Sequence, residues 1–166
     1  PLTEANRTAN ASDLMQISAA ASGYAPGNAE DVELLINGAQ TYDALIAAFE
    51  QATHHIHLEY YIFEPDHTGT RIRDALIEQA KRGIKVRVLL DRLGSKNVKE
   101  AFLRPLRQAG AEIDFFHPFF FKRLWRPEIN LRSHRKIAVI DGIIGFTGGI
   151  NITDDENEAV RKDAYI

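Results

Sequence analysis

The spacing of hydrophobic residues alternates along the chain between a helical and an extended period. Segments 41–53 and 69–82 place apolar side chains three and four residues apart, which is typical of amphipathic helices. Segments 56–63 and 84–90 are rich in β-branched and aromatic residues, which predicts strands. Strands that alternate with helices of this length favour βαβ units, in which helices cover both sides of a mainly parallel sheet.

The second half of the chain continues this alternation. Segment 97–109 predicts a further helix, in which Pro105 starts a second short turn. Thr41 is the expected N-cap of the first helix of the domain. Three more strands are predicted at 113–116, 136–140 and 143–147. We therefore predict an α/β fold, a three-layer α-β-α sandwich around a mixed, mainly parallel sheet.

The first thirty residues differ from the rest. An Ala/Ser-rich stretch at 11–22 predicts a short helix, which Gly23, Pro26 and Gly27 interrupt. We expect an N-terminal helical appendage or linker at 1–30 and the main domain at 31–166. No apolar run approaches the roughly 18 residues that a membrane helix needs. Because the sequence begins at Pro1 without a signal segment, we expect a piece of a longer gene product.

Composition narrows the chemistry. With 45% hydrophobic and 26% charged residues, the chain has the composition of an ordinary globular protein. The absence of Cys excludes a disulfide framework, a thiolate nucleophile and a Cys-based metal site. The net charge of −3 conceals a basic stretch at 81–136. That stretch is either a solvated face or a surface that attracts a phosphate-bearing partner, a lipid headgroup or a nucleic acid.

The most distinctive motif reads H-x-K-x4-D-x6-G-G-x-N. Its residues are His134, Lys136, Asp141, Gly148, Gly149 and Asn151. An imidazole can attack phosphorus, and a lysine can neutralise a phosphoryl oxygen. Glycines let backbone N–H groups approach an anion, and the asparagine adds an amide donor. Because His134 and Lys136 are two residues apart where a strand begins, they share one face. We expect both ends of the motif to meet at one edge of the sheet.

This motif resembles the signature of the phospholipase D superfamily, and the chain is most similar to bacterial cardiolipin synthases from about Asp31 to Asn151. The resemblance implies two similar halves, each with one motif, and catalysis without a metal or another cofactor. One histidine forms a phosphohistidine, and the histidine of the other motif protonates the leaving alcohol. Carried over, His134 is the nucleophile or the acid, Lys136 and Asn151 bind phosphate, and Asp141 is a supporting carboxylate or purely structural.

The chain departs from the family pattern in two respects. Gly149 stands where the superfamily often has Ser, although Gly-Gly is the cardiolipin-synthase form. A second motif is absent, and the chain stops at Ile166 soon after the first, so we expect a domain truncated at its C-terminal end. The family also places an acidic residue downstream of the asparagine, a position that Asp163 could fill.

Two other clusters leave alternatives open. His55, His57 and Glu59 alternate on one strand and either bind zinc or line a cleft or the core. Glu59 and Tyr60 could instead orient groups beneath the site. Segment 115–126 mixes aromatic and basic residues, and it either enters a lipid interface, packs in the core, or stacks on single-stranded nucleic acid.

The leading hypothesis is a cardiolipin-synthase-like phosphatidyltransferase, with phosphatidylglycerol as substrate. The resemblance implies a bacterial cytoplasmic membrane as its location. A second half with its own H-x-K-x4-D motif (an HKD half) would come from the same gene product or from a homodimer mate. The alternatives are a single-motif phosphodiesterase or nuclease that acts as a homodimer, and a non-catalytic half-domain.

Overall fold

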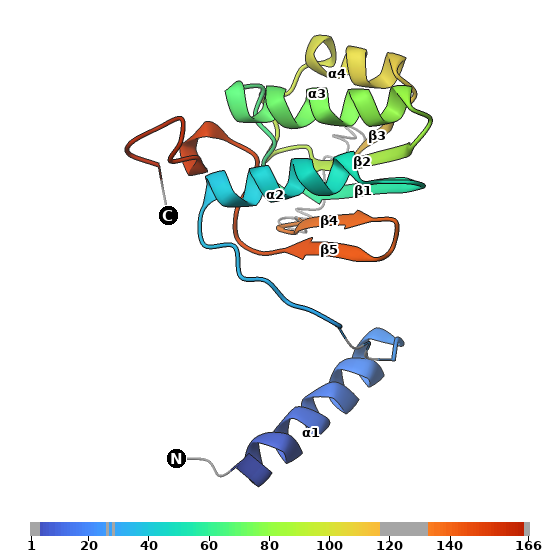
Figure 1. The fold of residues 1–166 in the computed structure, drawn as a ribbon, viewed down its shortest axis with the longest axis vertical. Helices are drawn as coiled ribbons and strands as arrows, with labels where there is room; N and C mark the ends of the chain where they lie inside the picture. Colours follow the sequence, from blue (N-terminus) through green and yellow to red (C-terminus); the bar gives the residue numbers. More distant parts are fainter. Residues whose placement is uncertain (1–3, 26, 28, 117–132, 165–166) are drawn as a thin grey trace, which may run out of the picture. The chain divides into compact units, whose positions relative to one another are not determined.

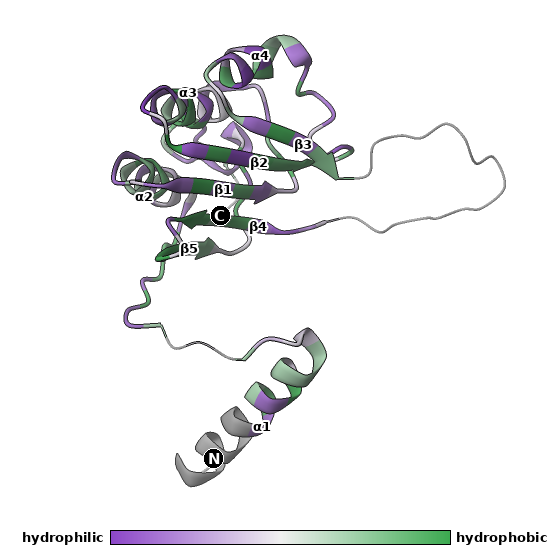
Figure 2. Ribbon diagram, turned by 90° about the vertical axis from the view of Figure 1, so that its right-hand side faces the viewer, coloured by the Kyte–Doolittle hydropathy of each residue, from purple (hydrophilic) through white to green (hydrophobic). Residues whose placement is uncertain are grey.

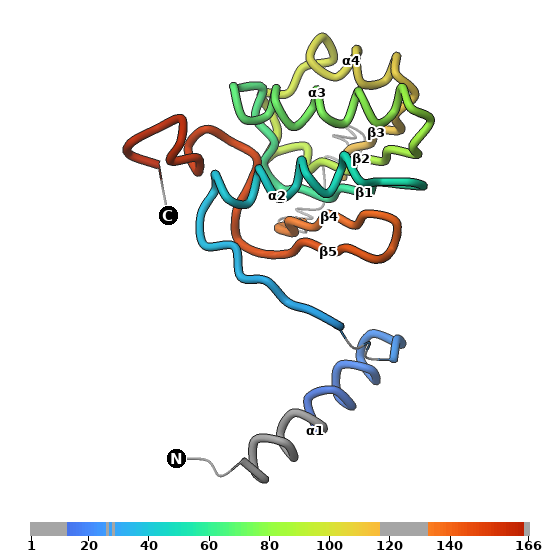
Figure 3. Tube along the Cα trace, viewed as in Figure 1, coloured from blue at the N-terminus to red at the C-terminus, as the bar shows by residue number. Residues whose placement is uncertain are grey.

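The computed structural model of the chain describes residues 4–25, 27, 29–116 and 133–164. It divides into two units, Pro1–Leu34 and Leu35–Ile166. The first unit contains helix α1 (Glu4–Ser22), which begins earlier than the predicted segment 11–22 and ends where Gly23 adopts a left-handed φ of 75°. The second unit contains every strand of the described residues, and Figure 3 follows its backbone.

A five-stranded mixed sheet forms the centre of the second unit, in the order β3-β2-β1-β4-β5 (Figures 1 and 2). Its strands are β1 (His55–Tyr60), β2 (Lys85–Asp91), β3 (Glu112–Phe116), β4 (Lys136–Ile140) and β5 (Ile144–Thr147). The first three run parallel, whereas β4 pairs antiparallel with both β1 and β5. The predicted α/β class and mixed sheet are confirmed.

Helices α2 (Gly38–Glu50), α3 (His67–Lys81) and α4 (Glu100–Gln108) lie side by side on one face of this sheet (Figure 1). Alternate strand residues are buried beneath them, including Ile56 and Leu58 of β1 and Val88 of β2. The residues between these, such as Glu59 and Arg87, lie on the other face, where they remain partly or fully exposed. The described residues therefore supply one of the two predicted helical layers.

Two local predictions were wrong. The N-cap of α2 is Asn37 and not Thr41: the Asn37 side chain accepts a hydrogen bond from the Gln40 N–H at 2.9 Å. Asn37 has the extended conformation of an N-cap, whereas Thr41 lies inside the helix and its hydroxyl donates to the Asn37 carbonyl at 2.7 Å. The helix therefore begins at Gly38, before the predicted segment. Pro105 lies inside the continuous helix α4. Proline has no N–H to donate to the carbonyl four residues earlier, that of Ala101. Ala101 is exposed, so water can reach this carbonyl.

Asp141 fixes the far end of the β1–β4 pair. Its carboxylate accepts hydrogen bonds from the backbone N–H groups of Thr53, His54 and His55 at 2.7–2.8 Å and from the Thr53 hydroxyl at 2.8 Å. The residue adopts a left-handed φ of 54°, which a short polar side chain tolerates best. The hydrogen bonds, that from His55 first and then that from Thr53, hold the pKa of Asp141 well below its ordinary value of 3.8.

We predict that Leu45→Ala destabilises the domain by about 2–5 kcal/mol, because the fully buried side chain leaves a cavity beneath α2. Urea denaturation followed by circular dichroism measures this change. Ile143→Ala, at a side chain that is 87% exposed, is the matched control and should change stability by no more than about 0.5 kcal/mol. Equal losses in the two variants would contradict the core described above.

We predict that Asp141→Asn lowers the melting temperature at neutral pH, since an amide oxygen cannot replace a carboxylate that serves four donors. A depressed carboxyl pKa stabilises the folded state above the unfolded-state pKa, and this contribution is lost as pH falls through the folded-state pKa. The difference in melting temperature from the unsubstituted chain should therefore be largest near pH 7 and shrink below about pH 4. Glu50→Gln, at an exposed carboxylate, is the control, and a pH-independent difference for Asp141→Asn would refute the assignment.

Candidate active site

Two segments of the motif meet at the end of β1. In the strand register Lys136 lies opposite Tyr60, and Thr147 lies opposite Ile137. After β5 the chain runs beside the residues that follow β1, where the Ile152 N–H donates to the Ile62 carbonyl at 3.1 Å. The structure thereby brings the start of β4 and the loop 148–151 to the same edge of the sheet.

His134 is exposed just before β4, and its imidazole lies against the ring of Tyr61. The two ring centroids are 4.6 Å apart and the ring planes are tilted by 46°. Behind the imidazole lies the Lys136 ammonium, whose Nζ is 3.1 Å from His134 Nδ1 and donates to the His134 carbonyl at 3.1 Å. The Tyr61 ring also faces this nitrogen, at 5.3 Å from the ring centroid.

Lys136 is only 4% exposed, which is unusual for a lysine. Burial lowers the pKa of its ammonium, and the negative charge of Glu156 acts in the opposite direction. A partly desolvated cation beside a ring nitrogen is a suitable partner for an anionic group held by His134.

Asn151 is 7% exposed, and its polar groups are held from several directions. Its side-chain Nδ2 and its backbone N–H each donate to Glu156 at 2.6 Å, and its Oδ1 accepts from the Ile62 N–H at 3.3 Å. The buried hydroxyl of Tyr42, on α2, donates to the Asn151 carbonyl at 2.6 Å. The amide therefore has one defined orientation.

Sequence reasoning missed both Glu156 and Tyr61. Glu156 follows Asn151 by five residues in an acidic run, and only the 3-10 turn η1 (Asp154–Glu156) folds it back onto the asparagine. Tyr61 is the residue directly after Glu59 and Tyr60, the two residues proposed from the sequence to orient groups beneath the site. The family's acidic residue downstream of the motif asparagine is the available signal, and the sequence alone offers Asp163 for that position as readily as Glu156.

Gly148 and Gly149 are exposed, and a Cβ on either would meet nothing within 4 Å. No packing within the described residues requires glycine at these two positions. The space beside the loop is open to an approaching group.

The structure does not bring Asp141 to this cluster. It lies past the end of β4, next to His55 at the start of β1, whereas His134 and Lys136 lie at the opposite end of the strand pair. Asp141 stands between the two ends of the motif, and the five-residue strand β4 separates it from Lys136. Its contacts match the structural alternative.

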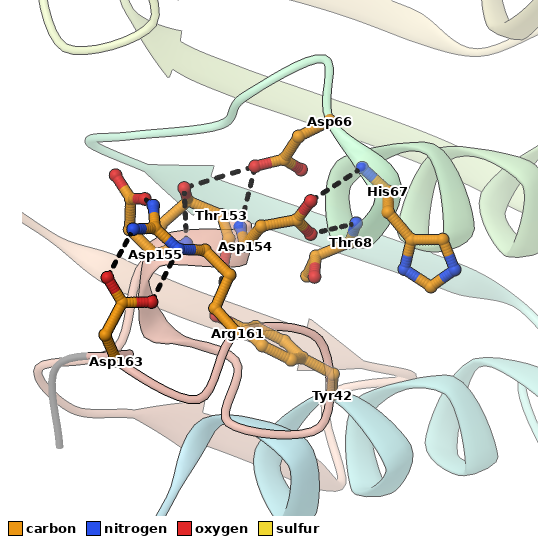
Figure 4. A network of polar contacts seen from close by, with 9 residues as sticks. All are labelled: Tyr42, Asp66, His67, Thr68, Thr153, Asp154, Asp155, Arg161 and Asp163. Atoms are coloured by element: carbon orange, nitrogen blue, oxygen red, sulfur yellow. Dashed lines mark hydrogen bonds and ion pairs between the residues drawn. The ribbon is translucent and has the colours of Figure 1, made fainter.

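Three other candidate residues have separate surroundings. Glu59 accepts hydrogen bonds from the Ser133 hydroxyl and, at 3.4 Å, from Arg135, so it holds the residues on both sides of His134. Tyr60 is buried on the helical face, and burial raises the pKa of its phenol. Asp163 is exposed and pairs with Arg161 at 2.8 Å, a pair that Figure 4 shows beside η1. No contact joins Asp163 to Asn151 or His134 in the described part of the chain.

His55, His57 and Glu59 of β1 are not arranged to bind a metal ion. Among the described residues, no group of three His, Asp or Glu side chains could hold one. His55 and His57 stack with ring centroids 4.6 Å apart. Burial and then the neighbouring His55 lower the pKa of His57. These residues line the open face of the sheet.

Only part of the aromatic and basic segment 115–126 can be placed. Phe115 is half-buried on β3, and the Arg92 guanidinium lies 3.8 Å from the centroid of its ring. Residues 117–126 lie outside the described residues. Within the described residues, no helix combines the length and apolar character that crossing a membrane requires.

Comparison with known proteins gives a consistent family. A model described as "Cardiolipin synthase, PLD-like domain" matches residues 45–162. The chain is 51% identical over 124 residues to cardiolipin synthase 1 of Bacillus cereus, a match that covers 74% of this chain and 24% of that protein. The chain thus spans about a quarter of the length of the curated relatives it matches.

Solved structures share the fold. NucT from Helicobacter pylori superposes with a TM-score of 0.53 at 25% identity, covering 69% of this chain and 68% of that one. Nuc from Salmonella typhimurium, a phospholipase D family member, superposes with a TM-score of 0.51 at 21% identity, covering 69% and 66%. Together with the family match over most of the domain, these findings show that the chain belongs to the phospholipase D-like domain family of the cardiolipin synthases.

Proposed function

We propose that this chain supplies one half of the active site of a phosphatidyltransferase that makes cardiolipin through a phosphohistidine. The observation that carries the proposal is the cluster of an exposed imidazole, His134, a buried ammonium, Lys136, and an oriented amide, Asn151. A nucleophile, a cation and a neutral donor at one edge of the sheet are groups that transfer of a phosphoryl group requires.

In the proposed reaction, a ring nitrogen of His134 attacks the phosphorus of phosphatidylglycerol. The nitrogen–phosphorus bond forms as the phosphorus–oxygen bond to glycerol breaks, and glycerol leaves with a proton from the histidine of the second motif. The terminal hydroxyl of a second phosphatidylglycerol then loses its proton to that histidine and attacks the phosphohistidine. The nitrogen–phosphorus bond breaks, cardiolipin forms and His134 is regenerated, so two phosphatidylglycerols yield cardiolipin and glycerol.

The surrounding groups have distinct proposed roles. Lys136 and Asn151 bind the non-bridging phosphoryl oxygens, and the loop at Gly148 and Gly149 leaves room for the phosphate beside its backbone. Tyr61 and the Glu59 contacts hold the His134 segment in place. Asp141 acts at a distance, by fixing the strand that carries His134. No metal or other cofactor takes part in this scheme.

The site needs a second motif, which comes from the rest of the same gene product or from a homodimer mate. In this proposal residues 31–166 form the first half-domain with its H-x-K-x4-D motif, and residues 1–30 form a helical appendage or linker. The substrate places the enzyme at a membrane surface, for a bacterial enzyme the cytoplasmic membrane. The relatives' name, cardiolipin synthase, supports a lipid substrate over a nucleic acid.

We predict that the protein carrying this chain together with its second motif converts phosphatidylglycerol in vesicles to cardiolipin and glycerol, and that EDTA leaves the rate unchanged. His134→Ala should lower the rate by at least about 1000-fold, because loss of the nucleophile ends the covalent route. Thin-layer chromatography of labelled lipid measures both products.

His54→Ala removes an exposed histidine away from the cluster and is the matched control, with a rate close to that of the unsubstituted protein. Cleavage of DNA without turnover of lipid would replace the proposal with a phosphodiesterase or nuclease. Lipid turnover that persists in His134→Ala would contradict the assigned nucleophile.

A further inference from the structure

We propose that Glu156 is a positioning residue of this site, which orients the Asn151 amide and also acts electrostatically on Lys136. The inference rests on the proposed function, and it assigns a role to a residue outside the H-x-K-x4-D-x6-G-G-x-N pattern. Glu156 lies five residues beyond the last residue of that pattern.

The first argument is the geometry of the carboxylate. One oxygen of Glu156 accepts from Asn151 Nδ2 and the other from the Asn151 backbone N–H, both at 2.6 Å. Two charge-assisted bonds to one residue fix both its backbone and its side chain. Since Oδ1 of the same amide faces the Ile62 N–H, the amide cannot flip without placing like groups against each other. One Nδ2 hydrogen remains for a ligand.

The second argument is that Glu156 itself sits in a rigid frame. The turn η1 that carries it is capped by Thr153, and Asp66 accepts hydrogen bonds from the Thr153 hydroxyl at 3.2 Å and the Asp154 N–H at 2.6 Å (Figure 4). Asp154 in turn accepts from the first N–H groups of α3, at His67 and Thr68. The turn is therefore tied to the start of α3.

The start of α2 holds Glu156 from the other side. A Cβ added to Gly38 would lie 1.7 Å from the Glu156 carbonyl oxygen, so the helix and the turn touch backbone to backbone. Nearby, the Glu158 carboxylate accepts from the Ala39 N–H at 3.3 Å. The red C-terminal segment of Figure 3 lies along the start of α2 in agreement with these contacts. A frame that clamps a partly buried carboxylate from two helices suits a residue that orients another.

The third argument is charge. Lys136 is buried, and the His134 imidazole, the Tyr61 ring and the paired Tyr60 of β1 lie around it. The Glu156 carboxylate acts on its ammonium electrostatically. Glu156 is the one negative charge that acts on Lys136 in the described part of the chain, and it offsets the effect of burial on the pKa of the ammonium. Its removal should make Lys136 lose its proton at a lower pH.

Two substitutions separate the two roles, in the preparation that converts phosphatidylglycerol to cardiolipin. Glu156→Gln removes the charge and leaves one acceptor, so we expect kcat about 10-fold to 100-fold lower, below the cost of deleting a donor outright. The alkaline limb of the profile of kcat/KM against pH should also move to lower pH. Glu156→Asp keeps the charge on a side chain too short to reach both donors. We expect a lower kcat with the alkaline limb unmoved.

Asp155→Asn is the control, because that neighbouring carboxylate is exposed and pairs with Arg161. It should leave both kcat and the pH profile unchanged. Melting temperatures identify a variant that fails to fold. If Glu156→Gln does not fold, Glu156→Asp decides: kcat equal to the unsubstituted value overturns the inference.

Failure of the inference and failure of the proposed function give different results. An unshifted alkaline limb and full kcat in folded Glu156→Gln, with His134→Ala inactive, overturn the role of Glu156 alone. A His134→Ala variant that remains active overturns the function on which that role depends.

Discussion

The antiparallel pairing of β4 with β1 decides which side chains of the motif can act together. Its register places Lys136 opposite Tyr60, so that Lys136 points toward the helix-covered face. Ser133 and Arg135, on either side of His134, donate hydrogen bonds to Glu59 on the other face. A slip of one residue would exchange these two sets. The pairing is locked at both ends, by Glu59 beside His134 and by Asp141 beside His55.

This constraint explains why one motif contains residues with such different surroundings. The residues from Ser133 to Asp141 cross the sheet once, so the histidine and the aspartate must lie at opposite ends of a strand. The return along β5 brings the glycines and Asn151 back to the end occupied by His134. Asp141 fixes the position of β4, whereas the side chains of His134, Lys136 and Asn151 lie at the candidate site itself.

Much of the fold could be predicted from local patterns. The strands at 56–63, 84–90 and 136–140 have apolar and β-branched cores, and α3 has a clear amphipathic period ended by Gly83. The start of α2 was harder, because Thr41 and Asn37 are both good caps and the choice depends on contacts between Gly38 and Glu156 across the chain. The arrangement of helices on one face could not be derived either, since periodicity does not tell which side of a sheet a helix covers.

In the site, the proximity of His134 and Lys136 could be predicted, because residues two apart at the start of a strand share one face. Glu156 and Tyr61 could not be predicted, because neither belongs to a spacing pattern. They reach the site through the η1 turn and the bend after β1.

The proposed function depends most directly on His134 as the nucleophile. The most direct measurement is to quench the reaction with labelled phosphatidylglycerol at alkaline pH, where phosphohistidine is stable, and map the label by mass spectrometry. The account predicts a phosphatidyl group on His134, and a labelled protein that carries the group on another residue would contradict it.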